Sequence, residues 1–164
     1  EEVVPAAAPL AAAAHPPTAS TLTRHVIDFQ QPTVGSAVLP AEATRLAGTK
    51  GGRELVARIT LELPADRRGV RFHVLVNPPE GAKNVGFHDP SFAGTIAPFG
   101  SHGGGHMAGP STFDVPLTGA IRKLRAANLW DATKPIRVQV VPDTRGVTAT
   151  PFSVPLTSIT IRTI

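Results

Sequence analysis

Residues 53–77, RELVARITLELPADRRGVRFHVLVN, contain the two clearest strand patterns in this 164-residue chain. Over residues 53–63 the apolar side chains fall on alternate positions with polar or charged ones between them. The alternation returns over residues 70–77, where Val70, Phe72, Val74 and Val76 share one face. A period of two predicts strands with one buried face. The polar turn at residues 64–69 predicts that the two strands pair as an antiparallel hairpin.

The rest of the chain predicts more strands and one helix. Strands are expected within residues 23–30, 37–39, 92–99, 111–115, 134–142 and 148–164. Residues 118–130 predict a short helix with Thr118 as its cap and an inner stripe of Ile121, Leu124 and either Ala127 or Asn128. We therefore expect an all-β domain, a sandwich or barrel of seven to eight antiparallel strands with one short helix.

Length and composition predict one domain preceded by an arm. Residues 1–20 are a low-complexity Ala/Pro segment, which we interpret as a linker or exposed arm, and residues 21–164 form the β domain. The chain has no cysteine, which excludes disulfides, thiolate metal sites, a cysteine nucleophile and a blue copper centre.

The charge pattern gives little sign of a nucleic-acid or membrane partner. The net charge is +4, but the basic residues are scattered and do not interleave with aromatic ones, so we expect no nucleic-acid partner. No apolar run reaches the length of about 18 residues that a membrane helix needs, so no membrane partner is expected. The compartment stays open: a secreted or periplasmic location fits a chain whose leader has already been removed.

Motifs for catalysis by the chain alone are missing from the sequence. It has no Gly-x-Ser-x-Gly nucleophile elbow, and its glycine run at 103–105 lacks the lysine of a phosphate loop. Its acidic residues are scattered rather than paired as glycoside chemistry requires. We therefore expect the chain by itself not to be catalytic.

Two short motifs carry a family resemblance. Residues 72–77, FHVLVN, followed by residues 92–95, FAGT, resemble the C-terminal domain of plant polyphenol oxidases. The motif positions are Phe72, Val74, Asn77, Phe92, Ala93 and Gly94. The order of the later elements agrees with that domain over residues 53–164. Two departures are a loop richer in glycine and histidine, and a helix that is basic rather than acidic.

The resemblance implies a role beside an enzyme. Polyphenol oxidases and tyrosinases carry a helical catalytic domain with two coppers, each held by three histidines. Their C-terminal β domain covers the copper site and keeps the enzyme latent, often with one side chain pointing into the site. It implies that this chain is a shielding domain of a copper-dependent phenol oxidase of the tyrosinase or catechol oxidase class. Copper would then belong to the parent enzyme, and the partner would be the di-copper catalytic domain of the same polypeptide.

The loop after the second motif has three interpretations. It is an exposed loop without a ligand, a transient copper contact, or a plug for the partner's active site. The plug would consist of Phe99, His102, His106 and Met107, with Phe99 or Met107 at its tip. His102 and His106 have helical spacing, but the three glycines between them cost a helix roughly 1 kcal/mol each. A flexible loop can still bind copper through imidazole and thioether groups.

That chemistry defines the alternative function, a free-standing copper-binding or copper-delivery β protein. Its ligands would be His88, His102, His106 and Met107. His88, followed by Asp89, is better explained as an ordinary turn residue, and His73 as a hydrogen-bonded residue of the sheet.

Overall fold

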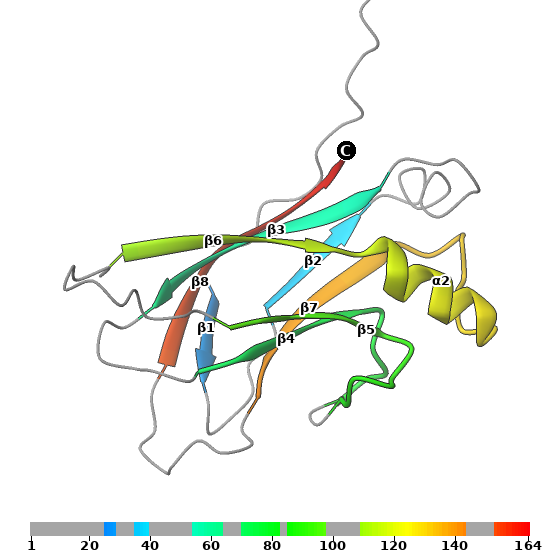
Figure 1. Ribbon diagram of the computed structural model, residues 1–164, viewed down its shortest axis with the longest axis horizontal. Coiled ribbons are helices and arrows are strands. Elements are labelled where there is room, and N and C mark those ends of the chain that lie inside the picture. Colours follow the sequence, from blue (N-terminus) through cyan, green and yellow to red (C-terminus); the bar gives the residue numbers. More distant parts are fainter. Residues whose placement is uncertain are drawn as a thin grey trace, which may run out of the picture.

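The computed structural model describes residues 25–28, 35–39, 54–63, 70–82, 85–97, 109–143 and 153–164. Over these residues, eight strands form two antiparallel sheets of four (Figure 1). The first sheet has the order β1-β8-β3-β6, with β1 His25–Asp28, β8 Ser153–Thr163, β3 Leu55–Leu63 and β6 Gly109–Pro116. The second has the order β2-β7-β4-β5, with β2 Gly35–Leu39, β7 Ile136–Pro142, β4 Phe72–Val76 and β5 Phe92–Ile96.

These sheets confirm the expected mostly-β class, with antiparallel pairing and one short helix. In the described ranges no strand pairs across from one sheet to the other, so the two sheets do not close into a barrel. Residues 1–20 lie outside the described ranges, and the division of the chain at residue 20 stays a prediction. No helix in the described part of the chain is both long and apolar enough to cross a membrane.

The predicted hairpin is wrong. β3 pairs with β6 and β8, whereas β4 pairs with β5 and β7, so the two strands belong to different sheets. Their apolar faces meet across the core instead of lying side by side in one sheet. The connection between them, residues 64–71, is also longer than the two-residue turn that most strongly specifies a hairpin.

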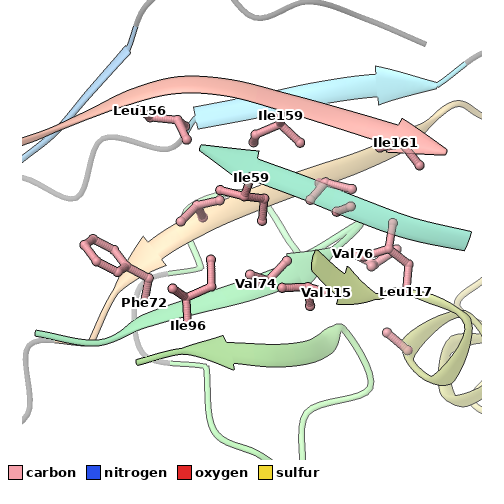
Figure 2. Packing of buried hydrophobic residues seen from close by; sticks show 14 of the residues in the cluster. Ile59, Phe72, Val74, Val76, Ile96, Val115, Leu117, Leu156, Ile159 and Ile161 are labelled. Atoms are coloured by element: carbon pink, nitrogen blue, oxygen red, sulfur yellow. The ribbon is translucent and has the colours of Figure 1, made fainter. Parts of the chain in front are cut away.

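The core lies between the inner faces of the two sheets (Figure 2). The first sheet contributes Ile59 and Ile159, and the second contributes Phe72 and Val74, all fully buried. The expected inner face of β4 is therefore confirmed. Burial of each such side chain stabilises a fold by about 1.5–3 kcal/mol, which lets this cysteine-free chain build its own core.

The helix α2, Thr118–Ala126, connects β6 of the first sheet to β7 of the second. Ile121 and Leu124 are buried as predicted, but Ala127 and Asn128 are exposed. The predicted cap is also wrong: Leu117 is the N-cap residue, and its side chain makes no capping hydrogen bond. The Thr118 hydroxyl instead accepts a hydrogen bond from the Leu55 backbone N–H at 3.1 Å, which joins the helix to the start of β3.

The helix ends earlier than residue 130 because Asn128 adopts a left-handed conformation, with φ 56°. The Asn128 N–H donates to the Arg125 carbonyl and the Leu129 N–H to the Leu124 carbonyl. This pair of bonds is a Schellman motif, which satisfies the last helical carbonyls and turns the chain away. Leu129 is left 63% exposed.

The outer face of the second sheet is covered as well. Every residue of β4 is buried, including those that point away from the main core. A second apolar cluster, Leu75, Val85 and Val141 with Ala82 and Phe92 against it, lies on this outer side. Residues from the connection between β4 and β5 thus cover the outer face of β4 and β7. This outer layer contains the candidate site.

Candidate functional site

The first family motif has structural roles throughout. Phe72 and Val74 are core residues of β4. Asn77 follows the strand with φ 44°, a left-handed conformation that asparagine tolerates better than most residues. Its side-chain oxygen accepts a hydrogen bond from the Arg137 backbone N–H at 2.6 Å, which ties the end of β4 to β7.

The second motif shapes the edge strand β5. Val74 pairs with Gly94 but Leu75 pairs with Phe92, so the register skips Ala93 and β5 contains a bulge there. A Cβ atom on Gly94 would lie 3.0 Å from the Val115 Cγ1 atom of β6. Glycine therefore allows the edges of the two sheets to approach each other at this point.

The bulge has a second effect, on Phe92. Strict alternation would place Phe92 on the same face as Gly94, toward the main core. With Ala93 as the extra residue, Phe92 instead joins the outer cluster over β4. There it packs edge to face against His73 and Phe87, with ring centroids 5.5 Å and 5.1 Å away.

His73 is the centre of this outer layer. It is 5% exposed, and its Nε2 lies 3.3 Å from the Asp143 carboxylate, which is 8% exposed. Its Nδ1 lies 3.2 Å from the Thr95 hydroxyl. Because an ionised carboxylate only accepts, Nε2 carries the proton, and in the neutral ring Nδ1 accepts from Thr95. We call His73, Thr95 and Asp143 the histidine cluster.

The histidine cluster is best explained as a structural clamp. It joins β5, β4 and the residue after β7, and confirms the expectation that His73 is a hydrogen-bonded residue of the sheet. The order hydroxyl, imidazole and carboxylate resembles a catalytic triad. However, Thr95 lies within strand β5, not on the sharp turn that exposes a nucleophile.

A second group of side chains faces solvent next to this cluster. Phe87 is 53% exposed and is held against Phe92 and His73. Lys123 of α2 lies over the Phe92 ring at 5.7 Å, and its ammonium group donates to the Phe92 carbonyl at 3.0 Å. Arg122, the residue before it, is exposed. We call Phe87, Phe92 and Lys123 the aromatic–basic face.

The outer face of the first sheet carries polar side chains that pair with one another. Arg58 forms a two-pronged ion pair with Asp114 at 2.9 and 3.0 Å, and Arg162 bonds the same carboxylate at 2.7 Å. The hydrogen bond from Arg58, with the charges of both arginines, holds the pKa of Asp114 below its ordinary value. These contacts cross β6, β3 and β8 and account for the charges there without a ligand.

A shallow hollow of about 370 Å³ lies where the turn after α2 meets the end of β4. Asn77, Leu129 and Arg137 are among the residues that line it. Its charged groups already have partners: Lys134 lies 3.5 Å from Asp131, and Arg137 donates to the Pro78 carbonyl. Hydrogen bonds from Thr133 lower the pKa of Asp131. Because these polar groups are already paired within the described part of the chain, nothing marks the hollow as a ligand site.

The predicted metal ligands are not brought together in the described structure. His88 is an exposed turn residue, whereas Phe99, His102, His106 and Met107 lie outside the described ranges. Among the residues that the structure describes, no three histidine or acidic side chains are grouped so as to hold a metal ion. Copper binding at the loop and its role as a plug therefore stay predictions.

Of the comparisons with known proteins, the one with solved structures finds matches. The chain matches no protein-family model and no curated protein sequence. Among solved structures, it has the fold found in part of polyphenol oxidases, which confirms the resemblance noted in the two motifs. One match is a recombinantly expressed latent aurone synthase, co-crystallised with hexatungstotellurate(VI), with TM-score 0.56 and 18% identity over 87% of this chain and 26% of that one.

The second match is the latent aurone synthase from its natural source, with TM-score 0.54 and 19% identity over 80% of this chain and 24% of that one. The chain thus spans about a quarter of the length of the structures that it matches. At these identities the likeness establishes the fold.

The sequence did not predict which side chains contact the residues of the candidate site. Asp143 directly follows the Val-rich strand, but nothing in the sequence pairs it with His73. The sequence alone assigned no role to Phe87. One signal was available: a phenylalanine in a polar turn, flanked by Gly86 and His88, has no core strand to join.

Proposed function

We propose that this chain is the shielding domain of a tyrosinase-like di-copper phenol oxidase, non-catalytic by itself. The observation that carries the proposal is the fold: 87% of the chain matches about a quarter of a polyphenol oxidase whose structure was solved in a latent form. A domain of that size leaves three quarters of such a protein to form the catalytic part. Copper would belong to that part, and this chain would act on it from outside.

The mechanism is steric. The shielding domain covers the entrance to the copper site, so that a phenol cannot reach the metals until the domain is cut off or displaced. The segment between β5 and β6 is the proposed plug, with Phe99, His102, His106 and Met107 as the side chains that enter the site. This segment connects β5 and β6, which are edge strands of the two sheets and contact each other at Gly94. That attachment supports the proposed role.

The test uses the natural gene product that contains this chain. An antibody to the chain follows its size in source cells while the oxidation of a diphenol is measured in the same extracts. We expect a precursor several times longer than this chain, a rise in oxidase activity as a fragment of about 17 kDa is released, and renewed inhibition when the purified chain is added back. A chain of about 17 kDa made from its own start codon, with no linked oxidase activity, would disprove the proposal.

A further inference from the structure

We propose that residues 85–95, which we call the outer strap, open from the second sheet as one unit while the rest of the domain stays folded, and that Lys123 of α2 is the latch that holds the strap closed. The strap comprises the end of the connection between β4 and β5 and most of β5 itself. It lies at the edge of the second sheet, next to α2 (Figure 1). This inference goes beyond the proposed function and does not depend on it.

The first argument is the limited attachment of the strap to the sheets. Among the described strands, β5 is an edge strand that pairs with β4 alone, and the bulge at Ala93 interrupts that pairing. None of the first four residues of β5 is fully buried. Ala93 touches the main core and Ile96 lies within it, so the strap ends there. Edge segments with few buried apolar contacts open at a lower free energy than central strands.

The second argument is what the strap covers. Phe87 and Phe92 pack on the His73 ring, with ring centroids 5.6 Å and 5.5 Å away, and the strap itself contributes Thr95 to the histidine cluster. The strap thus covers the buried pair of His73 and Asp143. Burial of such a pair has a desolvation cost, and opening returns both groups to water. Opening the strap is therefore less costly than exposing an apolar surface of the same size.

The third argument is the latch. The Lys123 ammonium group donates to the Phe92 carbonyl at 3.0 Å and lies 5.7 Å from the centre of the Phe92 ring. On the buried side of α2, Ile121 and Leu124 belong to the main core, so the helix is anchored independently of the strap. Lys123 therefore fastens the strap to an element that stays in place. Because Lys123 is exposed, its hydrogen bond contributes little net free energy and can break and form again.

Hydrogen exchange of the 164-residue chain, measured by mass spectrometry at a series of low urea concentrations, tests the opening. We expect the protected amides of the strap to exchange faster than those of β3 and β8. Their exchange should depend little on urea, because opening the strap exposes little surface. Diethyl pyrocarbonate, which acylates accessible neutral imidazoles, should modify the exposed His88 at once and the buried His73 only at the rate of strap opening.

Three variants test the latch. Lys123→Met removes the ammonium group but keeps an unbranched side chain, and it should accelerate exchange in the strap and acylation of His73 about two- to tenfold, the factor that one hydrogen bond contributes. Exchange in β3 and β8 should stay unchanged. Lys123→Arg keeps a cationic donor and should hold both rates close to wild type. Arg122→Met is the matched control, because Arg122 is exposed and directly precedes Lys123, and it should behave as wild type.

Three results would overturn the proposal. If the strap exchanges only together with β3 and β8, and with the same dependence on urea, it opens only when the whole domain unfolds. If Lys123→Met behaves as Arg122→Met does, Lys123 is not a latch. If Lys123→Met accelerates exchange throughout the domain, the residue supports global stability and not the strap. None of these measurements involves oxidase activity, so the shielding function stands or falls separately.

Discussion

The variant His73→Leu tests whether the histidine cluster is a structural clamp. Leucine fills much of the volume of the imidazole but removes a hydrogen-bonding partner from both Asp143 and Thr95. Breaking a buried ion pair from one side costs about 3–5 kcal/mol, and losing one hydrogen bond to a charged group costs about 1.5–3 kcal/mol. Asp143 retains 8% exposure, so we expect the lower range, a loss of about 2–3 kcal/mol.

The loss should lower Tm by about 4–12 °C for a domain of this size. Urea and thermal unfolding followed by the fluorescence of Trp130 and by circular dichroism measure it. The double variant His73→Leu, Asp143→Leu removes both polar partners, and buried pairs replaced by apolar residues often cost little. We therefore expect the double variant to be more stable than His73→Leu alone.

Two results would refute the clamp. One is a His73→Leu domain as stable as wild type. The other is a double-mutant cycle in which the losses at His73 and Asp143 simply add, since residues in contact should show a coupling of at least about 0.5 kcal/mol.

Three further predictions follow from individual contacts. Gly94→Ala should cost about 1–3 kcal/mol by forcing its Cβ against Val115, and Val115→Ala in the same chain should recover part of that loss in urea unfolding. Asn77→Ala should cost about 2 kcal/mol, from the left-handed backbone and the lost hydrogen bond to Arg137, whereas Asn77→Gly should cost less because glycine keeps the conformation. Asp114→Asn should cost a small amount at neutral pH and low salt. Since the folded pKa of Asp114 is lowered, its contribution is present above the ordinary value of 3.8 and is lost as pH falls through the folded value. Thermal melts of the two proteins should therefore converge in acid, and a constant difference at every pH would contradict this.

The strands were largely predictable because each places alternate apolar side chains in the main core. The alternation in residues 53–63 and 70–77 placed β3 and β4 and their inner faces, since burial requires a period of two. Pairing was not predictable from the same pattern. Two amphipathic strands satisfy it equally well side by side in one sheet or face to face across a core, and only the rest of the fold selects between them.

The candidate site was less predictable because it depends on departures from regular structure. The skipped register at Ala93 turns Phe92 outward, and no periodicity in the sequence announces it. His73 and Asp143 lie on β4 and just after β7, strands that become neighbours only through the sheet order. The predicted end of the helix at residue 130 was wrong for a similar local reason: Asn128 adopts a left-handed conformation.

The motif that suggested the family consists of residues that packing dictates. Phe72 and Val74 fill the core, Asn77 closes a turn, and Gly94 allows two sheet edges to meet. Such residues are required by the fold. Two chains can therefore share the fold although only 18% of their residues are identical. Function must then be sought where packing leaves the choice of residue open.

Helix α2 is such a place. Its buried stripe needs only apolar residues at positions such as Ile121 and Leu124, so packing does not fix the charge of its exposed face. The resemblance led us to expect an acidic helix, and here it carries Arg122, Lys123 and Arg125 without an acid. If the proposed shielding function holds and α2 meets the catalytic partner, an acidic partner surface would complement this reversed sign. The sign of the charge on α2 is therefore a prediction about a surface outside this chain, and exchanging charge across the two surfaces, with Arg122→Glu against an acidic-to-basic change on the partner, should restore latency that either change alone weakens.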